Sequence, residues 1–154
     1  MKIVYKVLAY LVAVEVAVQA AVMVYGDAGL GKWVAQGGVL DKTVMESEAS
    51  PFPEVIGLIA HGINGMMVIP VIALLLLISS FFARVPGAVK AAGLVLLLVA
   101  VQVTLGLFGH DIPALGALHG LNALLLFSTA LYAARRDRSV GVPAQAEPRL
   151  GTTG

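Results

Sequence analysis

The sequence contains no cysteine and few charged or aromatic residues. The missing cysteines exclude disulfides, thiolate metal sites and cysteine nucleophiles within these 154 residues. Charged residues make up 12% of the chain and aromatic residues 6%, whereas hydrophobic residues make up 59% and the mean hydropathy is +0.94. Since about a quarter of the residues in a soluble domain are charged, this composition indicates that a lipid bilayer is the solvent of the chain.

A membrane-spanning helix needs about 20 predominantly apolar residues. Four runs of the sequence are long enough, at 4–25, 53–82, 86–108 and 114–134. We therefore expect an all-α fold, an integral membrane four-helix bundle that occupies 1–138 and has an outer loop at 26–52. The remaining residues, 139–154, include prolines, glycines and threonines and are expected to form a disordered cytoplasmic tail.

The charges are distributed unevenly between the two sets of helix ends. One set carries the basic residues Lys2, Lys6, Arg84, Lys90, Arg135, Arg136 and Arg138. The first connecting loop instead carries Asp27, Asp41, Glu46, Glu48 and Glu54 against only Lys32 and Lys42. By the positive-inside rule, this asymmetry predicts a multi-pass protein of the cell membrane with up-down-up-down helices and both termini in the cytoplasm.

The tetrapeptide His-Gly-apolar-Asn occurs twice, at 61–64 and at 119–122, each time inside a long apolar run. A second match relates Ala-Val-Gln at 17–19 to Ala-Val-Gln at 100–102, and an aromatic residue followed by glycine comes six residues later in both copies. The two matches together predict a duplicated helical hairpin, in which each copy donates one histidine.

His61 and His119 are expected at similar depths on the second and fourth helices, which run in the same direction. These helices are diagonal partners in an up-down-up-down bundle, and with neighbouring axes 8–10 Å apart the diagonal is roughly 13 Å. That separation suits two imidazoles that each bind one iron at about 2 Å, with a macrocycle between them. Since few other centres use two imidazoles and no carboxylate, we expect a haem b bound by His61 and His119.

Several small and polar residues accompany the histidines. Gly57 and Gly65 flank His61 by one turn, and Gly116 lies close before His119. These glycines either leave space for a porphyrin or serve helix packing. Gln19 and Gln102 lie near the histidine level, where their side chains are expected to donate to an imidazole or a haem propionate.

Glu15 lies one turn deeper than Gln19 on the same helix face. A carboxyl group in lipid is expected to be neutral or paired, so Glu15 is a candidate proton carrier or a packing residue. Asn64 and Asn122, three residues after each histidine, are expected to hydrogen-bond neighbouring helices. His110, beside Asp111 at the outer boundary, is expected to be a solvated loop residue.

Two patterns carry a resemblance to a known family. Gln102-Val-Thr-Leu105-Gly106 and His119-Gly-Leu-Asn-Ala123 resemble the Q-x-x-L-G and H-x-x-x-A patterns of one four-helix half of the haem A synthases. The chain looks still more like a family of small uncharacterised bacterial four-helix membrane proteins. The resemblance covers roughly 53–135 and implies a b-type haem bundle.

The chain departs from the haem A synthase pattern next to the first histidine. That family has a glutamate three residues before this histidine and an arginine directly after it, where this sequence has Leu58 and Gly62. The resemblance therefore implies haem ligation more strongly than it implies the oxidation of haem O.

Ligation by two histidines fills both axial positions of the iron and disfavours direct binding of oxygen or substrate. The sequence thus predicts a membrane cytochrome b that passes single electrons, with a quinone or a respiratory-chain protein as partner and no nucleic acid. One alternative is a cofactor-free accessory subunit or small-solute permease in which the histidines only link helices. Another is a haem A synthase-like oxidoreductase, and whether the protein is an enzyme stays open.

Overall fold

A computed structural model describes residues 1–47 and 50–136, and the tail predicted at 139–154 lies outside them. The elements are α1 (Lys2–Ala35), α2 (Lys42–Glu46), α3 (Val55–Ile63), the π-helical stretch η1 (Asn64–Val68), α4 (Ile69–Ser80), α5 (Ala88–Gly109) and α6 (Pro113–Arg135). Helices are the only regular elements in this part of the chain. The all-α prediction is confirmed for it.

Four helices are long and apolar enough to cross a membrane: α1, the continuous helix Val55–Ser80, α5 and α6. The predicted number of spans is confirmed, but one boundary differs. α1 continues through Gly26 and Gly29 to Ala35 instead of ending at residue 25, so the start of the predicted outer loop is helical. Gly26 and Gly29 pack closely against Leu58 and Glu54, and this packing supports the added turns of helix.

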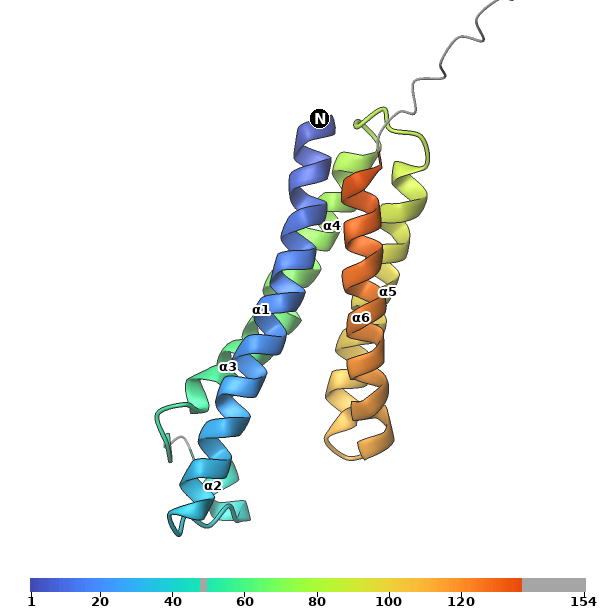
Figure 1. Cartoon of the computed structure of the whole chain (residues 1–154). Helices are drawn as coiled ribbons and strands as arrows, with labels where there is room; N and C mark the ends of the chain where they lie inside the picture. The colour runs from blue at the N-terminus through green and yellow to red at the C-terminus, as the bar shows by residue number, and fades with distance from the viewer. Residues whose placement is uncertain (48–49, 137–154) are drawn as a thin grey trace, which may run out of the picture.

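The helices gather their ends in two groups (Figure 1). The start of α1, the α4–α5 loop and the end of α6 lie together at one end, and the α5–α6 turn lies at the other. We call the first the basic end because its described residues include Lys2, Lys6, Arg84, Lys90, Arg135 and Arg136. α1 packs against α3, α4 and α6, and α5 packs against α4 and α6. The helix that contains α3 and α4 is therefore diagonal to α6.

The hydrophobic core occupies the half of the bundle nearer the basic end. It is formed by Tyr5, Ala9, Val12, Ala13, Ile69, Ile72, Ala73, Leu76, Ala83, Val85, Ala88, Ala91, Ala92, Val95, Val99, Leu126, Ala130, Ala133 and Ala134. Many of these residues are alanines, which allow helix backbones to approach closely in a membrane protein.

Arg136 joins two segments at the basic end of the bundle. Its Nε and Nη2 donate to the carbonyl oxygen of Pro86 at 3.0 and 2.8 Å, and its guanidinium group also contacts Tyr132. Gly87 has φ +71, and a Cβ there would collide with the Arg136 guanidinium group. These contacts of Arg136 connect the α4–α5 loop to the end of α6.

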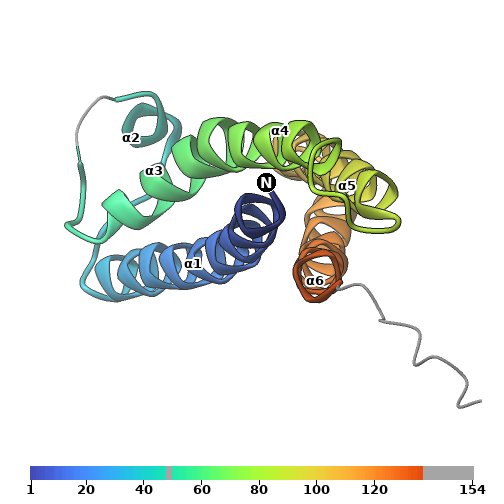
Figure 2. The same ribbon diagram turned by 90° about the horizontal axis from the view of Figure 1, so that it is seen from above.

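The other half of the bundle, which we call the open half, has almost no buried core. On α1, the inward-facing positions 5, 9, 12 and 13 are buried, but positions 20, 23 and 27, which continue the same helical stripe, are exposed. Figure 2 shows α1 and α3 leaning away from α5 and α6 in this half. The bundle is therefore packed at the basic end and separates into two helix pairs at the other.

Three residues after His61, the second spanning helix enters a π-helical stretch, η1. Pro70 follows at the start of α4, and a proline removes one N–H donor and clashes with the carbonyl four residues earlier, here Met66. The wider turn accommodates the proline without ending the helix. The helix thus continues past Pro70, and the π-helical stretch before it includes Asn64.

Candidate functional site

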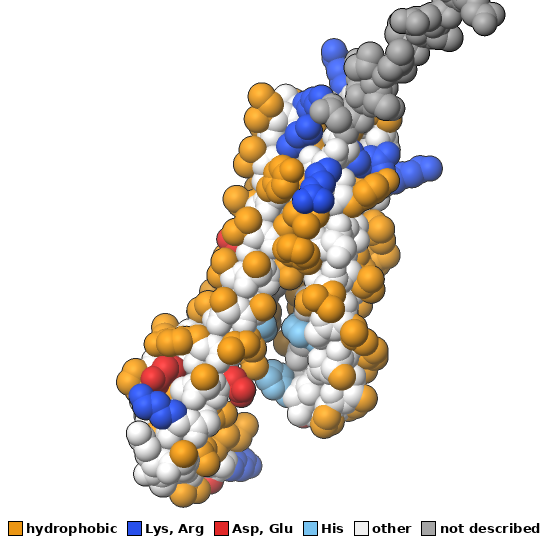
Figure 3. Space-filling model, in the orientation of Figure 1, with side chains coloured by type: hydrophobic (Ala, Val, Ile, Leu, Met, Phe, Trp, Pro, Cys, Tyr) orange, Lys and Arg blue, Asp and Glu red, His pale blue; other side chains and the backbone are white. Residues whose placement is uncertain are grey.

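The two histidines of the repeated tetrapeptide face each other across the open half. The ring centroids of His61 on α3 and His119 on α6 are 6.1 Å apart, with an angle of 57° between the ring planes. Figure 3 shows histidine side chains lining a cleft between the two helix pairs. Both residues are half-buried. Two histidines 58 positions apart in sequence (119 − 61) thus share one site.

Each imidazole is held by a backbone carbonyl of the other helix in its own pair. Nδ1 of His61 lies 3.2 Å from the oxygen of Gln19, and Nδ1 of His119 lies 2.9 Å from the oxygen of Gln102. Because a carbonyl oxygen only accepts hydrogen bonds, each Nδ1 must carry the proton. In the neutral ring, Nε2 then presents its lone pair, and within residues 1–47 and 50–136 no hydrogen bond occupies either Nε2.

This tautomer is the one that a metal-binding histidine uses when its second nitrogen donates to a backbone carbonyl. A metal lies about 2.0–2.1 Å from a histidine nitrogen, and the nitrogen lies about 1.1 Å from the ring centre for ring bonds of about 1.33 Å. Two rings on opposite sides of one metal ion therefore have centroids roughly 6.3 Å apart. The observed centroid distance of 6.1 Å is close to this value.

Asparagine and glutamine side chains brace the two pairs in related ways. In the α5–α6 pair, Asn122 Nδ2 donates to the oxygen of Leu98 at 2.9 Å and to Oε1 of Gln102 at 2.6 Å. In the α1–α3 pair, Asn64 Nδ2 donates to Oε2 of Glu15 at 2.8 Å, and Gln19 Nε2 donates to the oxygen of His61 at 2.9 Å. The sequence predicts the glutamine side chains as donors to an imidazole or a haem propionate. In the structure the imidazoles contact the glutamine backbone oxygens, and donation to a propionate stays a prediction.

The three glycines predicted near a cofactor lie against the partner helix of their own pair. A Cβ at Gly57 would collide with the carbonyl of Val22, and a Cβ at Gly65 would lie 2.6 Å from Nε2 of Gln19. A Cβ at Gly116 would lie 3.6 Å from the oxygen of Gly109. Their contacts are those of helix packing, and their part in holding a porphyrin stays a prediction.

Gly106 on α5 is a site residue that our sequence reasoning missed. A Cβ at this position would lie 3.1 Å from Cε1 and 3.2 Å from Nδ1 of His119, so the missing side chain makes room for the imidazole. The signal was present, because Gly106 ends the Q-x-x-L-G pattern that begins at Gln102.

In the described part of the chain, no three His, Cys, Asp or Glu side chains form a group that could hold a metal ion. His110 caps the end of α5 and is exposed. Any metal bound through these protein side chains would therefore rest on the histidine pair, with its remaining ligands supplied by another molecule. A porphyrin supplies four.

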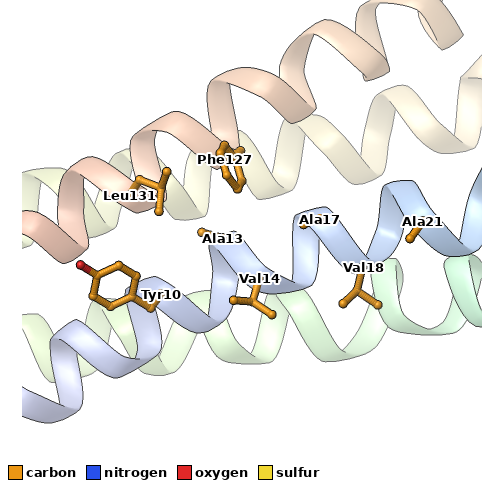
Figure 4. A pocket seen from close by; sticks show the side chains of 8 residues that line it. All are labelled: Tyr10, Ala13, Val14, Ala17, Val18, Ala21, Phe127 and Leu131. Atoms are coloured by element: carbon orange, nitrogen blue, oxygen red, sulfur yellow. The ribbon is translucent and has the colours of Figure 1, made fainter.

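A second concave surface lies away from the histidines. An apolar groove of about 440 Å³ runs between α1 and α6, lined by Tyr10, Ala13, Val14, Ala17, Val18, Ala21, Phe127 and Leu131 (Figure 4). The α1 residues form one stripe at helical spacing, and Glu15 and Gln19 are not part of it. The groove is thus a feature of the apolar surface, separate from the histidine pair.

The comparisons with known proteins place the chain in no family. No family model matches it, and no similarity was found to curated proteins or to solved structures. The functional argument therefore rests on the geometry of the site.

Proposed function

We propose that the protein is a membrane cytochrome that holds one haem b between His61 and His119 and passes single electrons. The observation that carries this proposal is the opposed pair of imidazoles, with centroids 6.1 Å apart and Nδ1 of each donating to a backbone carbonyl. With Nδ1 protonated, Nε2 of each ring would be available to bind an iron.

The residues of this chain fit the group. His61 and His119 would hold the group through their imidazole nitrogens, and the cleft between the helix pairs would have to take up the rest of it. When bound, a haem with two axial histidines supplies reversible one-electron transfer at iron. The hydrogen bonds to Gln19 and Gln102 would orient the rings and increase their basicity as ligands.

We further propose an up-down-up-down bundle made of a duplicated helical hairpin, since the same histidine-to-carbonyl bond occurs in the α1–α3 and α5–α6 pairs. The four apolar helices are compatible with a lipid bilayer. The basic end supports a cytoplasmic location for both termini, and a haem between the histidines would then lie nearer the opposite face of the cell membrane. A membrane quinone or a respiratory-chain protein is the proposed redox partner.

One alternative has its own structural support. Each histidine already joins two helices through its Nδ1 bond, which is all that a cofactor-free accessory subunit or permease would require. A haem A synthase-like oxidation has less support, because Leu58 stands where that family has its glutamate and packs against Gly26. A haem-binding protein and a cofactor-free protein would differ in their visible spectra and in their response to substitution of the histidines.

The deciding experiment is a visible spectrum of protein produced with adequate haem supply. We expect a low-spin b-type spectrum and, by pyridine haemochrome analysis, about one haem per chain. His61→Ala and His119→Ala should each abolish the low-spin spectrum, because one axial bond is lost. Folded protein that stays colourless would refute the proposal.

His110→Ala is the matched control, since His110 is exposed at the end of α5. This variant should keep the low-spin spectrum and the haem content. If it alone disrupted the spectrum, the assignment of the axial pair would be wrong. In the cofactor-free alternative, His61→Ala and His119→Ala would only lower stability, by about 0.6–2 kcal/mol for each lost interhelical bond.

A further inference from the structure

A carboxyl group lies near the middle of the first membrane span. Glu15 is the only acidic residue within 4–25, and none occurs in Val55–Ser80, α5 or α6. Its Oε2 accepts a hydrogen bond of 2.8 Å from Nδ2 of Asn64, the first residue of the π-helical stretch. Ionisable groups at such depth are costly in a membrane and tend to be functional.

The second helix pair shows that the fold does not need this carboxyl group. By the match of 17–19 to 100–102, the position equivalent to Glu15 is Leu98, four residues before Gln102. Asn122, the equivalent of Asn64, donates there to the backbone oxygen of Leu98 and to Gln102. An asparagine thus bridges the second pair with a leucine at the position of the acid, so a bridge of this kind does not require a carboxyl group.

A buried acceptor lies on the same face of α1. Oε1 of Gln19 is buried, and no donor for it exists among residues 1–47 and 50–136. Gln19 and Glu15 are four residues apart, a spacing at which helical side chains are neighbours. A protonated Glu15 could donate to Oε1 of Gln19, whereas an ionised one could not. Protonation of Glu15 would therefore allow one additional hydrogen bond, from its carboxyl group to Oε1 of Gln19.

Gln19 also connects this carboxyl group to the histidine site. Its Nε2 donates to the oxygen of His61, and its own backbone oxygen accepts from Nδ1 of the same histidine. An extra electron at an iron on Nε2 would favour the neutral form of a carboxyl group nearby, because the low dielectric of a membrane strengthens the repulsion of like charges.

We propose, resting on the haem function above, that Glu15 takes up one proton for each electron that the haem receives. The carboxylate becomes a carboxylic acid as ferric iron becomes ferrous, and the proton returns to the surroundings when the electron leaves. A membrane quinol, which loses one proton with each electron, is the class of donor that supplies both. The site would then gain no net charge inside the membrane.

If Glu15 takes up a proton with each electron, the haem potential depends on pH, and few other titratable groups lie close to Glu15. Of the elements packed against α1, α4 contains no titratable residue and α3 contains only His61. α6 contains His119, Tyr132 and Arg135, and it packs on the Ala13 side of α1. On α1 itself, Tyr10 is the titratable residue nearest to Glu15 in the sequence, followed by Lys6, Tyr5, Tyr25 and Asp27, and none of them is at a spacing of three or four from Glu15.

The test is a potentiometric titration of the haem-loaded protein at several pH values. We expect the midpoint potential of the wild type to fall as the pH rises, because the ionised carboxylate disfavours the added electron. Glu15→Gln and Glu15→Leu, the second copying Leu98, should keep the haem and lose this dependence, and Glu15→Asp should restore it in part. Reduction should also produce the infrared C=O band of a protonated carboxyl group, absent from Glu15→Gln.

Asp27→Asn is the matched control, because Asp27 is the other acidic residue of α1 and is exposed. It should retain the slope of the wild type. A haem-loaded wild type whose potential ignores pH, or a Glu15→Gln variant with an unchanged slope, would overturn the inference and leave the haem function standing. Protein that never takes up haem would overturn both.

Discussion

The two halves of the bundle are built from the same kinds of residue but differ in what their interior faces contact. Near the basic end, Leu76, Val95 and Leu126 are at most 1% exposed. In the open half, Met23 lies on the inward-facing stripe of α1 and is 42% exposed. One half is a packed core, and the other is two helix pairs with a pair of histidines between them.

The difference lies in which helices approach each other. In the open half, glycines hold each pair together, as Gly57 does against α1 and Gly109 does against Gly116. Contact between the pairs is instead made by the alanine-rich core near the basic end. The packed half can therefore hold the two pairs in register while the open half leaves space for another molecule.

The largest expected effect tests the packed half. Leu76 is 0% exposed, and Leu76→Ala should lower the unfolding free energy by about 2–5 kcal/mol, because it leaves a cavity that four helices cannot easily close. Met23→Ala removes a side chain of similar size from the open half and should cost well under 1 kcal/mol. Unfolding in mixed micelles measures both. Equal losses would mean that the open half is packed in the membrane.

A smaller effect tests the glycine contacts of the open half. Gly57→Ala would drive a Cβ into the carbonyl of Val22, and we expect a loss of about 1–3 kcal/mol together with weaker haem retention. Gly62→Ala is the control on the same helix, since a Cβ there meets nothing within 4 Å. If the two variants were equally stable, the α1–α3 pair would not depend on close backbone contact.

The smallest expected effect concerns the asparagine bridge at the border between the halves. Asn122 is 5% exposed and donates to two acceptors on α5, so Asn122→Ala should cost about 0.6–1.7 kcal/mol. Asn64→Ala removes one donor bond and should cost less. The same unfolding measurement ranks the two variants. A larger loss for Asn64→Ala would make the α1–α3 bridge the more important of the two.

Much of the fold could be predicted because a bilayer imposes it. A hydrocarbon core requires spans of sufficient length with satisfied backbone hydrogen bonds, and hydropathy alone locates four of them in this chain. The histidine pair could also be predicted, because a repeated polar tetrapeptide inside apolar runs is conspicuous. The end of α1 could not, since Gly26 and Gly29 suggest a loop unless their packing partners Leu58 and Glu54 are known.

The sequence by itself determined the solvent, the four spans and the two histidines. Only the tertiary structure decided which half is packed, because lipid and core are equally apolar and hydropathy cannot distinguish a side chain that faces one from a side chain that faces the other. It also decided the tautomer of the histidines, since their partners are backbone oxygens of Gln19 and Gln102, and every residue carries such an oxygen. Because every residue has a backbone oxygen, the sequence cannot show which of these oxygens binds a histidine. That contact is known only from the packing of the helices.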